Sequence, residues 1–148
     1  MGFWTYSTSS ANHLITGTPE NDYGTYFLMD QSITDRLSIF ARYGVANSHV
    51  RNVGSNISAG FAVKGLIPRR SNDKFGIAMT RVNAGDEYKT SQASAGTKVK
   101  DNETVLEANY RIEVMPGLAV QPDYQYVMNP SFVNNNAHVV AARFEFNF

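Results

Sequence analysis

Charged and amide side chains recur at every second position in several segments of this sequence. They alternate with apolar neighbours, which places them together on one face of an extended chain. Both signs of charge occur among amides, so each group can exchange a hydrogen bond to water for one to a neutral polyol. A face with charges of one sign would instead favour ions. Each charged residue also has a structural alternative, in which it pairs with a charge on a neighbouring strand and holds the two strands together. The candidate solute-contacting residues are Arg36, Arg42, Lys64, Lys74, Glu107, Asn109, Arg111, Glu113, Gln121, Asp123, Gln125, Arg143 and Glu145.

Residues suited to catalysis or metal binding are sparse. His13 and His49 fall in polar segments predicted as loops, and His138 begins a strand with no Ser or Asp at a suitable spacing. The sequence contains no cysteine, no Gly-rich phosphate loop and no metal-ligand cluster. It therefore predicts no enzyme, no cofactor and no bound metal.

The totals restrict the class of protein. The 148 residues fit one domain, residues 1–148, and their net charge of zero gives no electrostatic footprint for nucleic acid. The mean hydropathy is negative, and no stretch approaches the roughly 20 apolar residues of a transmembrane helix. The first ten residues lack the basic and apolar regions of a secretory signal. A soluble all-β domain and a membrane β-barrel both fit, since barrel strands face lipid with only every second residue.

Period-two alternation predicts an all-β chain of eight strands. Most of these are about nine to eleven residues long, the length of a tilted membrane strand, whereas strands of soluble proteins are usually shorter. The predicted strands are Gly2–Ser7, Tyr23–Gln31, Arg36–Ala46, Asn56–Leu66, Asp73–Asn83, Glu103–Val114, Leu118–Asn129 and Ala137–Phe148.

The connections between these strands alternate between short and long. The short turns are Ser32–Asp35, Ile67–Asn72 and Met115–Gly117, and the longer polar segments are Thr8–Asp22, Asn47–Ser55, Ala84–Asn102 and Pro130–Asn136. Outer-membrane barrels sort their connections in this way because short turns face the periplasm and long loops face outside. A soluble sandwich has no physical reason to do so.

The two faces of the strands differ in chemistry. The last three strands separate apolar from charged residues cleanly, with aromatic residues gathered near strand ends as in membrane-interface girdles. Phe40 lies on the polar side of its strand, and Tyr23–Gln31 is ambiguous because Tyr26 and Leu28 compete with Phe27 and Met29 for the outer face. Small inward residues are expected to leave space in the lumen: Gly60, Ala62, Gly76 and Ala78.

Three segments resemble the carbohydrate-selective porins of the OprB family. The strand and exit of the family's C-terminal signature appear as Leu118, Gln121, Pro122, Asp123, Gln125, Tyr126, Asn129 and Pro130. An upstream strand is similar through Asp30, Gln31, Arg36, Phe40, Arg42, Tyr43 and Gly44, and a third segment through Gly60, Gly65, Leu66, Pro68, Arg70, Asp73 and Gly76. The usual Asn-Pro-Gly exit reads Asn129-Pro130-Ser131 here.

The resemblance implies the C-terminal half of an antiparallel barrel of about sixteen strands in the bacterial outer membrane. It implies passive diffusion of small sugars, contact with outer-membrane lipid and lipopolysaccharide, and recognition of Phe148 by the barrel-assembly machinery. An eight-stranded barrel is filled by its own side chains, so conduction would require further strands or a second copy. The alternatives are a small closed eight-stranded barrel with a structural, adhesive or lipid-hydrolase role, and a soluble β-sandwich.

Overall fold

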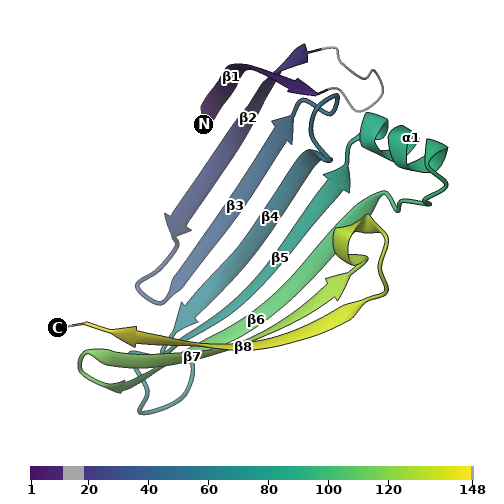
Figure 1. The fold of residues 1–148 in the computed structure, drawn as a ribbon. Coiled ribbons are helices and arrows are strands. Elements are labelled where there is room, and N and C mark those ends of the chain that lie inside the picture. The colour runs from purple at the N-terminus through teal and green to yellow at the C-terminus, as the bar shows by residue number, and fades with distance from the viewer. Residues whose placement is uncertain (12–18, 148) are drawn as a thin grey trace.

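The chain forms one antiparallel sheet of eight strands. The computed structural model describes residues 1–11 and 19–147, so His13 and Phe148 lie outside the described part. The strand order in space follows the sequence from β1 to β8, and each strand pairs with the one before it (Figure 1). The bounds are β1 Gly2–Ala11, β2 Pro19–Ser32, β3 Leu37–Ala46, β4 Val53–Lys64, β5 Lys74–Ala84, β6 Asn102–Met115, β7 Leu118–Met128 and β8 Ala137–Phe146. The predicted all-β antiparallel class is confirmed.

The first two strands extend beyond their predicted ends. The ladder continues past an irregularity after Tyr6 to Ser10 opposite Glu20 and Ala11 opposite Pro19. The prediction of a loop over Thr8–Asp22 was therefore too long, because pairing with a partner strand overrides the weak strand preference of a Ser-rich segment. Pro19 occupies the first position of its strand, where the missing N–H does least harm to the ladder.

The connections sort by end as predicted, although their lengths alternate less strictly. Residues 33–36, 65–73 and 116–117 join strands at one end of the sheet, called the short-turn end below. Residues 47–52, 85–101 and 129–136 join them at the other, called the long-loop end (Figure 1). The turn 65–73 is longer than the loop 47–52, which departs from the predicted order of lengths.

One helix interrupts the longest loop, where the sequence predicted irregular chain. The helix α1 spans Asp86–Ser94, with two acidic residues in its first turn and Gly85 extended before it. Acidic groups favour a helix N-terminus, and Gly96 leaves the helix in the left-handed conformation that ends many helices. Tyr88 of α1 packs its ring 6.2 Å from Phe132, which belongs to the short helix η1 (Pro130–Phe132). No helix of the described residues is long and apolar enough to cross a membrane.

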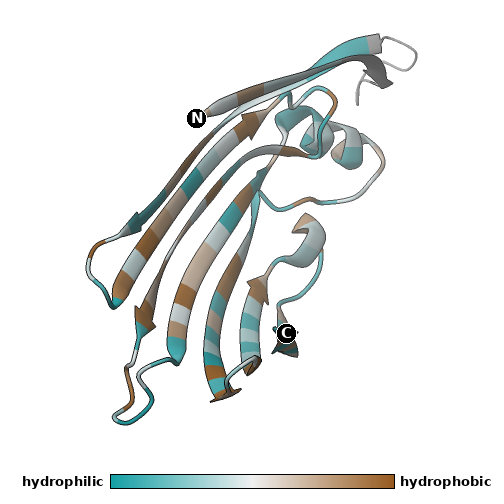
Figure 2. Ribbon diagram, turned by 90° about the vertical axis from the view of Figure 1, so that its left-hand side faces the viewer, coloured by the Kyte–Doolittle hydropathy of each residue, from teal (hydrophilic) through white to brown (hydrophobic). Residues whose placement is uncertain are grey.

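The sheet lacks the buried core of a sandwich. In the described part of the chain the buried apolar side chains are only Ala84, Ala119 and Phe132. Large apolar side chains are instead exposed, including Val140 at 81% and Phe144 at 62%, and hydropathy alternates in bands along the strands (Figure 2). β1 and β8 lie at opposite edges of the sheet and do not pair with each other. A soluble β-sandwich, which would cover one face with a second sheet, does not fit this arrangement.

Candidate channel lining

Cross-strand register assigns every strand residue to one of two faces. Residues directly opposite one another in an antiparallel pair point to the same face. The row Arg42, Ser58 and Thr80 is joined by direct opposition across β3, β4 and β5. Glu107 extends the same face, because it lies opposite Ala78 in β5 and Gln125 in β7. We call the face that carries Arg42, Ser58, Thr80 and Glu107 the inner face. The neighbours of these residues in sequence point to the opposite side of the sheet, which we call the outer face.

The predicted polar residues lie together on the inner face, with one exception. The twelve from Arg42 to Glu145 all occupy strand positions on this face in the observed register. Arg36 does not belong to a strand: it ends the turn before β3, and its carbonyl accepts a 2.7 Å hydrogen bond from the Lys64 amide. The expected strand start at Arg36 was wrong because the Thr34 hydroxyl accepts bonds from the amides of Arg36 and Leu37 and holds the turn.

Register also settles the strand that the sequence left ambiguous. Tyr26 lies opposite Gly44 and Leu28 opposite Arg42, so both point inward. Phe27 and Met29 lie opposite outer residues of β3. Phe40 is confirmed on the inner face, opposite Gly60.

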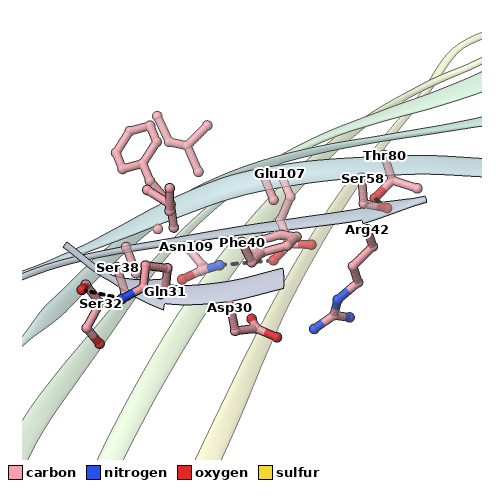
Figure 3. A pocket seen from close by; sticks show the side chains of 16 residues that line it. Asp30, Gln31, Ser32, Ser38, Phe40, Arg42, Ser58, Thr80, Glu107 and Asn109 are labelled. Carbon is pink, nitrogen blue, oxygen red and sulfur yellow. Dashed lines mark hydrogen bonds between the residues drawn. The ribbon is translucent and has the colours of Figure 1, made fainter. Parts of the chain in front are cut away.

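A hollow of about 480 Å³ lies against the inner face near the short-turn end (Figure 3). Small residues on β4 and β5 make room for it, as predicted for Ala62, Gly76 and Ala78. The prediction was wrong for Gly60, where a Cβ would lie 2.6 Å from the Phe40 ring, so this ring fills the space. The polar lining of the hollow comes from strands β2 to β6: Asp30, Gln31, Ser32, Ser38, Arg42, Ser58, Thr80, Glu107 and Asn109. The hollow therefore offers hydroxyl, amide, carboxylate and guanidinium groups within one space.

Some of the lining groups bond to one another. Asn109 donates to Glu107 at 2.9 Å, and Gln125 donates to Asp123 at 2.9 Å and to Glu107 at 3.4 Å. Arg111 of β6 reaches across β7 to Glu145 of β8, with both guanidinium contacts at 2.8 Å. The Gln125–Glu107 and Arg111–Glu145 bonds join different strands, so these residues have a structural role, while Glu107 and Asn109 also line the hollow.

Three cations form a row near the short-turn end. Lys64 lies directly opposite Lys74, and Lys74 lies directly opposite Arg111. Like charges at opposed positions destabilise a sheet. Arg111 is neutralised by Glu145, whereas Lys64 and Lys74 make no ion pair with any residue that the structure describes. We call Lys64, Lys74 and Arg111 the basic row; the sequence did not indicate it because the three residues meet only through register.

Buried carboxylates fix the connections at the two ends. At the short-turn end Asp73 is 2% exposed and accepts bonds from Arg70, from the Tyr110 hydroxyl at 2.8 Å and from the Glu113 amide at 3.0 Å. The Arg70 bond in the first place, with those of Glu113 and Tyr110, lowers the pKa of Asp73 from 3.8 to about 2. The folded turn therefore keeps Asp73 ionised at acid pH values at which an aspartate of ordinary pKa is protonated.

Ion pairs connect the segments at the long-loop end. Asp22 is 1% exposed and accepts a 2.6 Å bond from Nε of Arg51, whose pKa is raised chiefly by this bond. His49 is half exposed and lies between Glu20 at 2.9 Å and Glu87 at 3.0 Å. It therefore links β2, the loop 47–52 and α1, which agrees with its prediction as a surface loop histidine.

The outer face carries the aromatic residues expected near strand ends. Tyr124, Phe144 and Phe146 all point outward and are exposed. His138 shares this face and bonds to the Tyr124 hydroxyl at 2.6 Å rather than to a Ser or Asp. Residues 1–11 and 19–147 contain no cluster of three potential metal ligands.

Comparison with known proteins identifies similar chains. The model of the family described as "Carbohydrate-selective porin, OprB family" matches residues 5–148. The Porin AaxA of Chlamydia trachomatis serovar D is 34% identical over 115 residues, which cover 76% of this chain and 24% of that porin. The same porin of serovar L2 is 30% identical over 116 residues, with the same coverage.

A solved structure shares the fold. The high-pH structure of Pseudomonas putida OprB superposes with a TM-score of 0.87 at 21% identity, covering 99% of this chain and 43% of that one. The chain thus spans about a quarter of the AaxA porins and less than half of the OprB chain.

Proposed function

Because the chain belongs to the OprB family of carbohydrate-selective porins, we propose that it forms one side of a water-filled channel for small sugars in the bacterial outer membrane. The observation that carries the proposal is the inner face itself: one hollowed surface with charges of both signs, amides and hydroxyls. Such a surface replaces the water hydrogen bonds of a neutral polyol one at a time. The outer face, with Val140 and Phe144 exposed, would meet lipid.

The wall requires partners to close. Unpaired backbone groups at a sheet edge cost several kcal/mol each in hydrocarbon, so only closed barrels span membranes as sheets. The sheet has two such edges, at β1 and β8. We propose that residues 1–148 act as the C-terminal part of one barrel domain of about sixteen strands, which leaves a channel, rather than as a closed barrel of eight, which is filled by side chains. Strands from the same protein or from a second copy could supply the remainder.

A channel accounts for the polar residues better than an enzyme does. Hydrolysis would need a nucleophile beside a base at the rim. His138 bonds to Tyr124 on the outer face, and His49 lies between two glutamates. The proposed lining is the predicted inward set, with Arg36 at its short-turn rim. Lipopolysaccharide around the outer face and recognition of Phe148 during assembly belong to the same proposal.

Conductance of the purified protein in planar bilayers tests the channel. Stepwise conductance, together with glucose entry in liposome swelling, is the expected result. Absence of any conductance at every protein concentration would remove the proposal. Fractionation on a sucrose gradient should place the protein with outer-membrane markers, and Phe148→Ser should reduce its assembled amount there.

A further inference from the structure

The inner face carries aromatic rings that a water-filled channel does not require. Trp4, Tyr6, Tyr26 and Phe40 are its aromatic residues in the described strands, and all lie on β1, β2 and β3. Tyr6 is 58% exposed and Tyr26 43%. The outer face has lipid to cover its rings, but an aqueous lumen offers no such cover. Contiguous apolar surface exposed to water marks a binding site more often than it occurs by chance.

Register joins these rings into one continuous strip. Phe40 lies opposite Asp30 and diagonal to Leu28, which lies opposite Arg42. Tyr26 follows two residues from Leu28 on the same face of β2, and Trp4 is diagonal to Tyr26 across the β1–β2 ladder. Diagonal neighbours lie about 7–8 Å apart, within reach of aromatic side chains. Trp4 and Tyr6 then stand with ring centroids 5.5 Å apart. The aromatic strip Phe40–Leu28–Tyr26–Trp4–Tyr6 thus climbs from near the short-turn end toward the long-loop end.

Open space follows the strip along its length. The hollow of about 480 Å³ includes Phe40, a smaller one of about 120 Å³ includes Tyr26 and Trp4, and one of about 650 Å³ includes Trp4 and Tyr6. The two larger volumes fall in the range of small-ligand sites. Figure 3 shows Phe40 among the polar side chains of the first hollow.

Hydrogen-bonding groups accompany the rings. The Arg42 guanidinium lies 5.2 Å from the Phe40 ring centroid, and that of Arg51 lies 5.9 Å from the Trp4 ring. Asn56 lines both upper hollows. A pyranose ring has apolar C–H faces and a rim of hydroxyl groups. The face of an aromatic side chain attracts the positive ends of C–H bonds, so it suits the apolar face of the sugar. Hydrogen-bond donors beside the aromatic ring suit the sugar hydroxyls.

We propose that the aromatic strip is a stacking path along which a pyranose slides through the channel. This inference rests on the proposed channel function, and adds the side of the wall that the sugar follows and the residues that hold it. The charged residues of β6, β7 and β8 form the opposite, hydrated part of the same wall. The path uses none of the outer-face rings.

Sugar block of the ion current tests the path in the reconstituted protein. Tyr26→Leu, Phe40→Leu and Trp4→Leu each keep an apolar side chain but remove the flat ring. We expect each to weaken glucose binding about two- to tenfold, the effect of one contact as strong as an aromatic pair. Phe27→Leu, on the outer face of the same strand as Tyr26, is the matched control and should change nothing. Gel mobility without heating verifies that each variant folds.

Two further measurements make the result specific. Mannitol carries hydroxyls without a pyranose ring and should block the current less than glucose does. Subtracting the fluorescence of the Trp4→Phe variant from that of the unchanged protein gives the emission of Trp4. Glucose should change this emission. Equal block by glucose in every variant would overturn the path while leaving the channel intact, as would equal block by mannitol or a conducting channel that no sugar blocks. Absence of current would instead refute the channel itself.

Discussion

Replacing Gly60 by alanine should destabilise the sheet. A Cβ at this position would lie 2.5 Å from the Ile77 carbonyl oxygen and 2.6 Å from Cε1 of Phe40, whereas ordinary contact begins at 3.4 Å. The neighbours must therefore give way by 0.8–0.9 Å, the differences between these distances. The Phe40 ring can turn, but the carbonyl belongs to the backbone of a central strand.

The expected cost follows from two opposed effects. Overfilling a packed site costs about 1–3 kcal/mol. Replacing glycine within a strand returns about 0.5–1 kcal/mol of backbone entropy. The free energy of unfolding should therefore fall by about 1 kcal/mol at the midpoints of these ranges, and by at most about 2.5 kcal/mol. Urea titration in detergent micelles measures this change, with the folded fraction read from gel mobility without heating.

A second glycine of the same strand provides the control. The nearest atom to a Cβ at Gly54 is the Gly85 Cα at 3.4 Å, an ordinary contact. Gly54→Ala should therefore leave stability unchanged or raise it by up to about 1 kcal/mol. If Gly60→Ala proved as stable as Gly54→Ala, the close packing of Phe40 over Gly60 would be refuted. In Phe40→Leu, Gly60→Ala should cost less, since the clash with the ring is removed and only the backbone contacts with Ile77 and Ala78 remain.

Three other changes test the charged groups. The double change Lys64→Gln with Lys74→Gln removes the two cations of the basic row that have no anionic partner among the described residues. The reversal potential in a KCl gradient should therefore shift in the direction of higher cation selectivity. An unchanged potential would contradict the exposure of the two lysines to the ion path. Asp73→Asn should lower the unfolding temperature at neutral pH. Since the pKa of Asp73 is about 2 in the folded chain against an ordinary 3.8, its stabilisation is present above pH 3.8 and is lost as the pH falls toward 2. The two proteins should therefore converge at acid pH, and a constant difference would exclude this origin. Arg51→Ala leaves the buried Asp22 without its cation and should lower the free energy of unfolding by about 1–3 kcal/mol in urea titration. This is less than for a fully buried pair because Arg51 is half exposed. An unchanged midpoint would show that water replaces Arg51.

The sequence predicted the faces of most strands because alternation is a local property. In β6, Glu107, Asn109 and Arg111 alternate with apolar residues, and no partner strand is needed to see which face is polar. The segment Tyr26–Met29 defeats this reasoning, since four apolar residues follow one another. Its orientation depends on the register with β3, which places Arg42 opposite Leu28.

Features that depend on partners distant in sequence escaped prediction. The bond between Asp22 and Arg51 joins β2 to a loop, and the basic row joins three strands. The helix α1 lacked an amphipathic pattern, although Asp86 and Glu87 at its start and Gly96 after its end were usable signals. Arg36 was assigned to a strand because its alternation continues that of β3, while the Thr34 hydroxyl holds it in the turn.

The position of Phe40 over Gly60 has a consequence for how such walls evolve. The width of the lumen at this level depends on how closely the Phe40 ring approaches the sheet, and the residue opposite the ring limits this approach, since a Cβ there would lie 2.6 Å from the ring. A substitution of the glycine would narrow the opening without any change in the aromatic residue. In related porins that admit solutes of a different size, the positions of Phe40 and Gly60 should therefore change together. The two positions should covary in an alignment even where the first remains aromatic.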